Sequence, residues 1–414
     1  MRKRILVLLL LGSTVTVHGD ALPIQLVWDE VAFRGGAINV AESVELHRNR
    51  AIVGEILGRP VGFNTDAVVK GFNAATGQLV WSDEIANGER VFVGAAGSQA
   101  IAVASIPPIE DGIHDGLNIV VRSYDLGPGT IRYTAYAKLN APQQILIRNG
   151  KLVIVGYDQE TFRSQVRGLI VVLDIDTGQV LWTAPVENPI HMVLWDVDQA
   201  GRFIIAVGVM TDFASPTFPP PQTAVIRSYR LRDGHLRWER LEPGVLTYSI
   251  AVLNDTATIA GGEGFGTFLA AYNIADGSMK WKAASQLGFG PFLGVFSSNT
   301  KIVAFGSGQV VSFDTAGNLQ WSNSNLFRSV ARAFVVGDFV LTAGTEVVPP
   351  LSPEAPNQLV VRLYDAAGQV AQEDRREIGR TVFYGDAALQ NGRLAVVGRT
   401  SGALVRVYDM RPFE

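Results

Sequence analysis

The sequence predicts an all-β protein, an eight-bladed β-propeller with four strands in each blade. Three observations lead to this fold: a glycine-to-aromatic repeat along the chain, a pair of hairpins in each repeat unit, and an N-terminal strand that completes the last unit. The composition suits this fold, because 47% hydrophobic and 18% charged residues favour a large core and 43 glycines favour many turns.

The repeat places an aromatic residue four positions after a glycine. Branched apolar residues before the turn suit a strand, Asp or Asn with the glycine supplies the turn, and the alternating residues that follow suit a second strand. Each repeat is therefore a hairpin. Five copies end at Trp81, Trp182, Trp238, Trp281 and Trp321, and two weaker copies run from Gly129 to Tyr133 and from Gly368 to Gln372.

A second hairpin lies between successive repeats. Clear cases are residues 143–156, 330–344 and 385–398, with turns at Asn149-Gly150, Gly337-Asp338 and Asn391-Gly392. Asn-Gly between apolar runs is a strong signal for a tight hairpin. Two hairpins make four strands, and the unit recurs every 40 to 56 residues, a period typical of propeller blades.

The number of blades follows from the third strands, each of which carries a large apolar residue before its turn. There are eight such residues: Phe72, Tyr124, Leu173, Tyr229, Tyr272, Phe313, Tyr364 and Tyr408. Only seven fourth strands follow them. Residues 24–30 closely match residues 77–84, which form a fourth strand, so we expect the N-terminal strand to pair with the C-terminal three strands. That pairing closes the ring and leaves no unprotected edge.

Six of the seven tryptophans then share one structural role. Each is expected to bury its ring on an outer strand, against the turn of a neighbouring blade: Trp28, Trp81, Trp182, Trp238, Trp281 and Trp321. Trp195 lies outside the repeat, on an innermost strand. It either offers a stacking surface for a ring-shaped ligand or packs between blades, with Asp196 and Asp198 on the other face of the strand.

The N-terminus predicts export. Residues 1–19 read as a signal peptide, with a basic start at Arg2 to Arg4, an apolar core from Ile5 to Leu11 and cleavage near 19–21. The apolar core is too short to span a bilayer, and an uncleaved anchor is the alternative. Residues 23–414 are then a single propeller domain, expected to be a soluble monomer in the periplasm or outside the cell.

Charge and cysteine content exclude several functions. Loss of residues 1–19 removes three basic residues, so the net charge falls from −4 to −7. This acidity, with no basic stripe visible along the sequence, argues against a nucleic-acid partner. The absence of cysteine excludes disulfides, a thiol nucleophile, thiolate metal sites and a lipid anchor on cysteine.

The glycine-to-aromatic repeat resembles the PQQ-like β-propeller repeat, with a pattern close to Ala-x-Asp-x-x-x-Gly-x-x-x-Trp. The matching residues are Val172, Asp174, Gly178 and Trp182, with close variants at Asn73-Gly77-Trp81 and Asn273-Gly277-Trp281. The resemblance covers nearly the whole mature chain. It implies the propeller fold and says little about function.

Proteins with the PQQ-like repeat fall into two branches that are relevant to this chain. Quinoprotein dehydrogenases hold PQQ and Ca²⁺ over the propeller axis and usually add long insertions, a tryptophan floor, acidic Ca²⁺ ligands and often a cysteine pair. This chain has no cysteine and little length beyond eight compact blades. It is more similar to the non-catalytic propeller lipoprotein of the outer-membrane barrel-assembly machine, although it lacks the cysteine that tethers that protein. The resemblance therefore implies a binding role, and no cofactor is expected.

Long loops are expected between the second and third strands of four blades. In a propeller, these loops share one face with the links between blades, and the short hairpin turns share the other. The long loops are residues 106–118, 157–168, 211–223 and 345–358, whereas the fifth and sixth blades have almost none. Because loops on a rigid scaffold concentrate binding, we interpret this face as a binding face, with neutral insertions as the alternative.

Few residues predict chemistry. Potential metal ligands are Asp111, His114 and Asp115 in one loop, and the separate His47, His191 and His235. The first group has too few oxygen ligands for a Ca²⁺ motif, and the histidines have no zinc-type spacing. Residues 261–266, GGEGFG, lead into a strand, which excludes a phosphate loop before a helix. We therefore predict no catalytic or metal-binding residue and name no cofactor-binding residue.

The sequence thus favours an exported, non-catalytic propeller. It is expected to bind or scaffold another envelope or secreted protein through its long second-to-third strand loops. The alternative is an enzyme that uses the same face, either a PQQ- and Ca²⁺-dependent dehydrogenase or an enzyme that acts on a polysaccharide.

Overall fold

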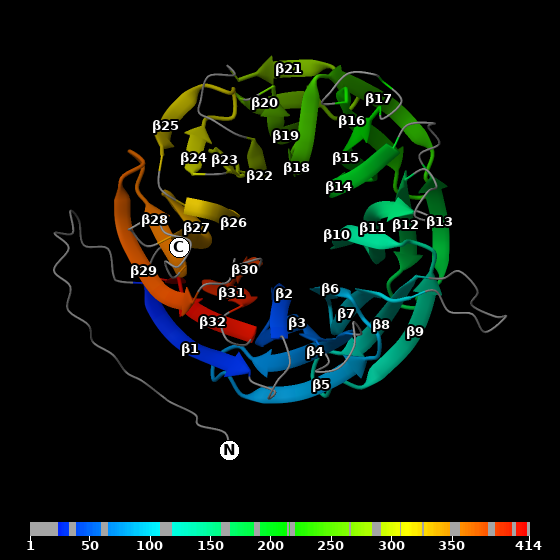
Figure 1. Ribbon diagram of the computed structural model, residues 1–414, viewed down its shortest axis with the longest axis vertical. Helices are drawn as coiled ribbons and strands as arrows, with labels where there is room; N and C mark the ends of the chain where they lie inside the picture. The colour runs from blue at the N-terminus through cyan, green and yellow to red at the C-terminus, as the bar shows by residue number, and fades with distance from the viewer. Residues whose placement is uncertain are drawn as a thin grey trace.

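A ring of eight antiparallel sheets surrounds a central axis (Figure 1). The computed structural model describes residues 24–32, 39–58, 65–107, 118–158, 166–185, 191–212, 215, 220–264, 266–283, 291–306, 308–324, 327–347, 357–379, 386–399 and 403–411. These residues form 32 strands, and each sheet contains four. The predicted eight-bladed propeller is confirmed. The predicted signal peptide, residues 1–19, lies outside the described residues.

In blades 1 to 7, four consecutive strands run from the innermost to the outermost position. Blades 1 and 2 contain β2 (Asn39–His47), β3 (Arg50–Gly58), β4 (Thr65–Asn73), β5 (Leu79–Ile85), β6 (Arg90–Ala96), β7 (Gln99–Ser105), β8 (Ile119–Asp125) and β9 (Ile131–Ala137). Blades 3 and 4 contain β10 (Ala141–Arg148), β11 (Lys151–Asp158), β12 (Arg167–Asp174), β13 (Val180–Pro185), β14 (His191–Ala200), β15 (Phe203–Thr211), β16 (Gln222–Arg230) and β17 (Leu236–Pro243).

The remaining blades follow the same order until the ring closes. Blades 5 and 6 contain β18 (Val245–Leu253), β19 (Thr256–Glu263), β20 (Gly266–Asn273), β21 (Met279–Lys282), β22 (Phe292–Ser297), β23 (Ile302–Gly306), β24 (Gln309–Phe313) and β25 (Leu319–Asn323). Blade 7 contains β26 (Phe327–Val336), β27 (Phe339–Val347), β28 (Asn357–Tyr364) and β29 (Val370–Gly379), and blade 8 contains β30 (Ala387–Gln390), β31 (Arg393–Arg399), β32 (Ala403–Asp409) and β1 (Gln25–Ala32).

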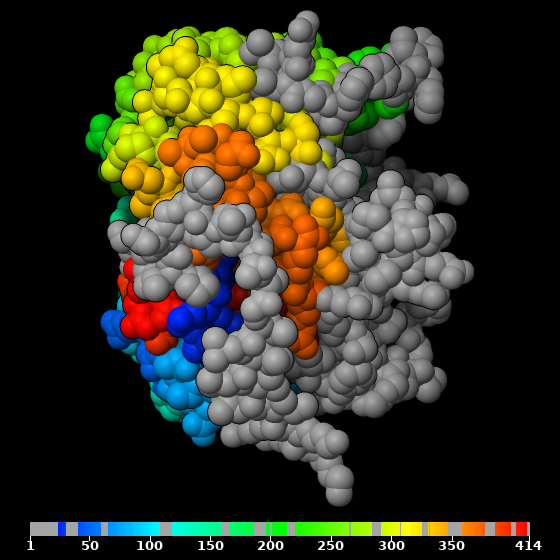
Figure 2. All heavy atoms as spheres, turned by 90° about the vertical axis from the view of Figure 1, so that its left-hand side faces the viewer, coloured from blue at the N-terminus to red at the C-terminus, as the bar shows by residue number. Residues whose placement is uncertain are grey.

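Blade 8 joins the two ends of the chain. β1 pairs antiparallel with β32, so that Gln25 lies opposite Asp409. Figure 2 shows this closure on the rim, with β1 in blue beside β32 in red. Arg376 of β29 forms an ion pair with Asp29 of β1, which ties blade 7 to the N-terminal strand. The predicted closure is therefore confirmed.

The core consists of apolar layers between adjacent blades. Eight buried clusters fill the eight seams within the described part of the chain. The eight third-strand residues that gave the blade count are among them, and Tyr124, Leu173, Tyr272, Tyr364 and Tyr408 are fully buried. Each blade therefore buries both faces of its sheet, which explains the apolar runs in its middle strands.

The repeat tryptophans close the seams, as predicted. Trp238 is only 9% exposed, and its indole Nε1 donates a hydrogen bond to the Ile274 carbonyl of the next blade at 2.9 Å. Gly277 of that blade has φ of 72°, and a Cβ there would lie 2.7 Å from the Trp238 ring. The turn therefore requires glycine for both its backbone conformation and its close approach. The same contact joins Trp28 to Gly77, Trp81 to Gly129, Tyr133 to Gly178, Trp182 to Gly234, Trp281 to Gly317 and Trp321 to Gly368.

Candidate binding face and central channel

The strand bounds confirm unequal connections on one face of the ring. The long connections between second and third strands are residues 106–118, 159–166, 212–221 and 348–356, and blade 1 adds residues 59–64. The predicted bounds of the 106–118 connection are confirmed, and in blades 3, 4 and 7 the strands extend further into the connections than predicted. The corresponding connections in blades 5, 6 and 8 are short. Asp111, His114 and Asp115 lie outside the described residues.

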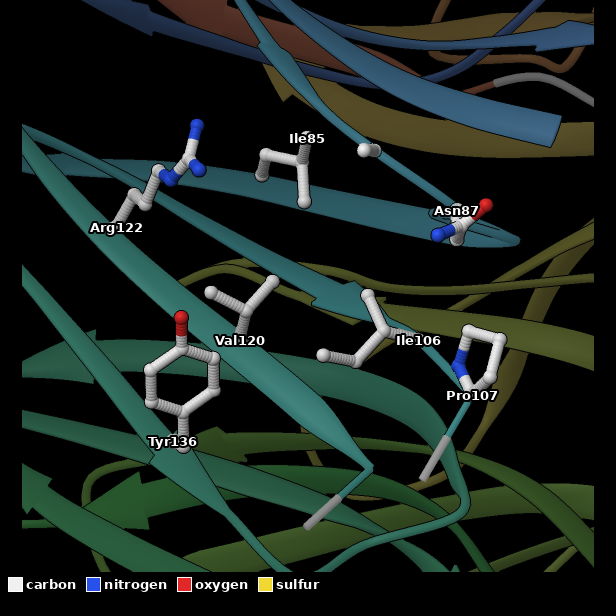
Figure 3. Close-up of a pocket in the computed structure, with 8 residues that line it drawn as sticks. Ile85, Asn87, Ile106, Pro107, Val120, Arg122 and Tyr136 are labelled. Atoms are coloured by element: carbon white, nitrogen blue, oxygen red, sulfur yellow. The ribbon is translucent and has the colours of Figure 1, made fainter. Parts of the chain in front are cut away.

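An apolar groove lies at the foot of the 106–118 connection, between blades 1 and 2. Its volume is about 340 Å³. Figure 3 shows Ile85, Ile106, Pro107 and Val120 gathered around it. Ile85 ends the outer strand of blade 1, whereas the other three belong to blade 2. The groove therefore opens on the predicted binding face, beside the base of a long loop.

Asn87 and Gly88 form one wall of the groove, and hydrogen bonds between their backbone and side chains of blade 1 hold this wall in place. Asn87 has a positive φ of 59°, and its N–H donates to the Asp66 carboxylate at 2.9 Å. The Gly88 carbonyl accepts a hydrogen bond from the Thr65 hydroxyl at 2.6 Å. Asparagine tolerates this left-handed conformation better than most residues. The wall is therefore formed before any partner binds.

Polar groups mark the other end of the groove. Arg122 Nη1 donates to Asp83 Oδ2 at 2.6 Å and to the Glu84 carbonyl at 3.0 Å. The Tyr124 hydroxyl donates to the same Asp83 oxygen at 2.8 Å. Because the Arg122 charge is neutralised by Asp83, the groove itself favours an apolar side chain.

The central channel contains a cavity of about 550 Å³. All eight innermost strands contribute to its lining, which includes the aromatic side chains Phe92, Phe296 and Phe334. Arg332 of β26 also lines it, and its Nε donates to Asp386 Oδ1 at 2.8 Å. Glu45 and Asp196 approach the same cavity from blades 1 and 4. One guanidinium therefore interacts with carboxylates of three other blades.

Two of these carboxyl groups have pKa values above the ordinary range. Burial raises the pKa of Glu45 to about 7, and the charge of Asp386 adds to that rise while Arg332 opposes it. Burial also raises the pKa of Asp196 to about 6, against hydrogen bonds from the Ile250 N–H and the Ser249 hydroxyl. Burial in the channel therefore favours the neutral form of both carboxyl groups.

Asp196 and Asp198 have a structural role at the hub. Asp196 Oδ2 accepts hydrogen bonds from Ser249 Oγ and Ile250 N, each at 2.9 Å. Asp198 Oδ2 accepts from Val252 N at 2.7 Å. Both carboxylates therefore connect β14 to β18 of the next blade. Trp195 lies on the innermost strand β14, as predicted, and a register shift in the pairing with β15 falls at its position.

The charged side chains of the channel contact one another and the backbone. No three His, Asp or Glu side chains within them are placed to hold a metal ion. The channel carboxylates Asp196 and Asp386 already have hydrogen-bond or ion partners, and Arg332 would repel a cation between them. His47 is half-buried, with its Nε2 3.0 Å from the Gly97 carbonyl oxygen, and His235 is exposed on a different blade.

Sequence analysis missed the channel cluster of Glu45, Arg332 and Asp386. The available signal was that each is a charged residue on or beside an innermost strand. Nothing in the sequence showed that the three would meet, since Glu45 lies near the start of the chain and Arg332 and Asp386 lie near its end.

The sequence of the chain matches a known protein family. The family model described as outer membrane protein assembly factor BamB matches residues 65–286, which is more than half of the chain. The chain belongs to the BamB family. The predicted resemblance to PQQ-like propeller repeats is thereby confirmed. No curated protein matches the chain in sequence.

Solved structures share the fold of this BamB-family chain at low sequence identity. BamB from Moraxella catarrhalis is 14% identical with a TM-score of 0.58, over 93% of this chain and 99% of that one. The computationally designed Ika8 protein is 12% identical with a TM-score of 0.61, over 93% and 99%. The quinohemoprotein alcohol dehydrogenase ADHIIG from Pseudomonas putida HK5 is 11% identical with a TM-score of 0.57, over 94% and 76%. At these identities the likeness shows the fold alone.

Within the described residues, none of the helical structure is long and apolar enough to cross a bilayer.

Proposed function

We propose that this BamB-family propeller is an exported scaffold protein that binds another envelope protein through its loop face. The observation that carries this proposal is the apolar groove at the foot of the 106–118 connection. It lies on the face with the long connections, and its Asn87–Gly88 wall is held by hydrogen bonds. A rigid, concave and apolar site loses little conformational entropy when a partner side chain enters it.

Family membership supports the same function. The matched family model is described as outer membrane protein assembly factor BamB, a description that fits a protein that binds other envelope proteins. Export through the predicted signal peptide would place the chain in the periplasm, where such a partner is found. The partner that we propose is an envelope protein with an exposed apolar side chain on an extended or looped segment.

We further propose that this function requires neither PQQ nor Ca²⁺. The arrangement of Asp196, Arg332 and Asp386 offers no vacant group of carboxylates to a cation among the described residues. A quinone absorbance that survived desalting after addition of PQQ and Ca²⁺ would contradict this and would favour the dehydrogenase alternative.

Substitution of Ile106 by Arg is expected to abolish partner binding. The change places a charge in the apolar groove, where burial without a counter-ion is costly. A photo-crosslinking amino acid at the exposed position Pro107 would record the contact in the envelope. We expect the chain that carries only the crosslinker to capture one protein. The chain that also carries Ile106→Arg should capture at least about tenfold less of that protein.

The matched control is Ile131→Arg on the outer strand of the same blade. Ile131 is 48% exposed and does not line the groove. This control is expected to retain the crosslink and the unfolding midpoint. Equal crosslinking in both variants would refute the groove as the binding site.

A further inference from the structure

Blade 4 departs from the repeat at the start of its third turn. In the other seven blades, the residue that begins this turn is Asp or Asn: Asn73, Asp125, Asp174, Asn273, Asp314, Asp365 and Asp409. Its side-chain oxygen accepts hydrogen bonds within the turn, as from Ala75 N to Asn73 at 2.9 Å and from Ala367 N to Asp365 at 2.9 Å. Blade 4 carries Arg230 at this position, which cannot accept such a bond. This loss of a local stabilising contact suggests a functional role.

Arg230 belongs to a basic cluster at the short-turn end of blade 4. We define the cluster as Arg202, Arg230, Arg232, Arg237 and Arg240. The two turns of the blade are joined by a hydrogen bond from Leu231 N to the Arg202 carbonyl at 2.9 Å. The guanidinium carbons of Arg202 and Arg237 lie 5.3 Å and 3.7 Å from the centre of the same Phe203 ring. The first and third turns of the blade therefore bring Arg202 and Arg237 together on the surface.

The cluster has more positive charge than its neighbours neutralise. Asp233 pairs with Arg230 at 2.9 Å and with Arg232 at 3.4 Å. Arg240 lies beside Asp276 and donates to its backbone carbonyl at 3.2 Å. Five guanidiniums against these two carboxylates leave a net charge of +3 on a chain whose net charge is −4.

Two arginines have no carboxylate partner among the described residues. Arg202 is exposed beside Phe203, and Arg237 donates only to the backbone carbonyls of Ile274 and Ala275. The side chain of Arg232 is 80% exposed despite its contact with Asp233. These guanidiniums are therefore available to an external anion, and guanidinium pairs well with phosphate groups.

Exposed apolar side chains lie along the same rim. Leu236 is 41% exposed and Leu241 is 46% exposed, both on β17, and Met279 on the neighbouring β21 is 45% exposed. Leu236 and Leu241 flank Arg237 and Arg240 in the sequence. Arginines with exposed leucines are the combination that binds the interface of an anionic bilayer, where charge meets the headgroups and apolar chains enter between them.

We propose that the basic cluster of blade 4 docks the propeller onto an anionic lipid surface through its phosphate headgroups. It lies on the short-turn side of the ring, opposite the loop face, so a propeller docked in this way keeps its loop face accessible. This inference is independent of the proposed protein partner. The five arginines come from the first and third turns of the blade and from the two strands that flank the third turn.

The test is co-sedimentation of the full chain with vesicles. Phosphatidylcholine vesicles containing about a third phosphatidylglycerol are compared with phosphatidylcholine alone. We expect binding to the anionic vesicles only, and a loss of that binding at about 0.5 M NaCl. The double variant Arg202→Gln/Arg232→Gln should weaken the binding about 30-fold, since each arginine near an anionic surface contributes about fivefold.

A control variant with the same charge change is Arg90→Gln/Arg167→Gln. Both residues are exposed at the loop-face ends of strands in other blades, where β6 and β12 begin, and the N-terminal residues 1–19 are identical in all the chains compared. This control should bind as the unchanged chain does. Equal weakening of both double variants, no binding to anionic vesicles, or binding to soluble polyglutamate but not to vesicles would overturn the proposal.

Discussion

The tryptophan of each outer strand lies where one blade meets the turn of the next. At Trp238 the ring is buried, its N–H is hydrogen-bonded to Ile274 at 2.9 Å, and Gly277 leaves the space that the ring occupies. The repeat therefore encodes a contact between neighbours, with the glycine of one unit matched to the aromatic residue of the preceding unit.

Trp238→Ala is expected to lower the free energy of unfolding by about 3–5 kcal/mol. The change removes a buried ring and leaves a cavity that the rigid turn at Gly277 cannot fill. Equilibrium denaturant unfolding would measure the loss. The control is Leu236→Ala on the same strand, because Leu236 is 41% exposed and its replacement should cost less than about 0.5 kcal/mol. Similar losses in the two variants would contradict the role of the seam.

Glu45→Gln tests the charged channel. The pKa of Glu45 is about 7 in the folded chain, above the ordinary value of 4.5. Its contribution to stability is therefore fully present below pH 4.5 and is lost as the pH rises through 7. Glutamine cannot ionise. The free energy of unfolding of the variant should therefore exceed that of the unchanged chain by about 1–3 kcal/mol at pH 8 and should differ little from it at pH 4.

Thermal or denaturant unfolding across this pH range would check the effect. Glu89→Gln, at an exposed position away from the channel, provides the comparison. A Glu45→Gln chain with the same pH profile as the unchanged protein would show that the carboxyl is not buried in the channel.

At the scale of the element, β1 closes the ring by pairing with β32. It is the fourth strand of blade 8, supplies Trp28 to the seam with blade 1, and binds blade 7 through Asp29 and Arg376. The Ile24 N–H also donates to Gln372 Oε1 at 2.6 Å, at the repeat position where blade 7 lacks an aromatic ring. A polar contact thus replaces the aromatic one next to the closure.

Removal of residues 1–32 is expected to destabilise the ring by at least about 3–5 kcal/mol, the cost of a single buried ring. The unpaired edge of β32 would also favour association between chains. Unfolding and size-exclusion chromatography would show both effects. Removal of residues 1–23 alone leaves β1 in place and should change neither. A chain without residues 1–32 that stayed monomeric and equally stable would disprove that β1 closes the ring.

At the scale of the whole molecule, the two faces of the ring differ. One face has the long connections and the groove at Ile106 and Val120, and the opposite side has the short turns and the basic cluster. A protein partner on one side and a lipid surface on the other would be compatible with each other. The two proposals fail independently, because Ile106→Arg changes only the groove and Arg202→Gln/Arg232→Gln changes only the cluster.

The sequence by itself determined the propeller, its eight blades, the closure by β1 and the tryptophan seams. Each of these depends on a pattern repeated within a single unit or between adjacent units, such as Asn149-Gly150 in a hairpin or Gly277 facing Trp238. Patterns of this kind are local, so the physical preference of each turn and strand can be recognised without coordinates.

Only the tertiary structure decided the composition of the candidate sites. The channel unites Glu45, Asp196 and Arg332 from blades that are distant along the chain, and the basic cluster unites Arg202 with Arg237 across a sheet. The reason is that ring closure and strand pairing place side chains at distances that no sequence spacing encodes. Burial in that closed ring then raises the pKa of Glu45, which an isolated strand in water would leave at its ordinary value.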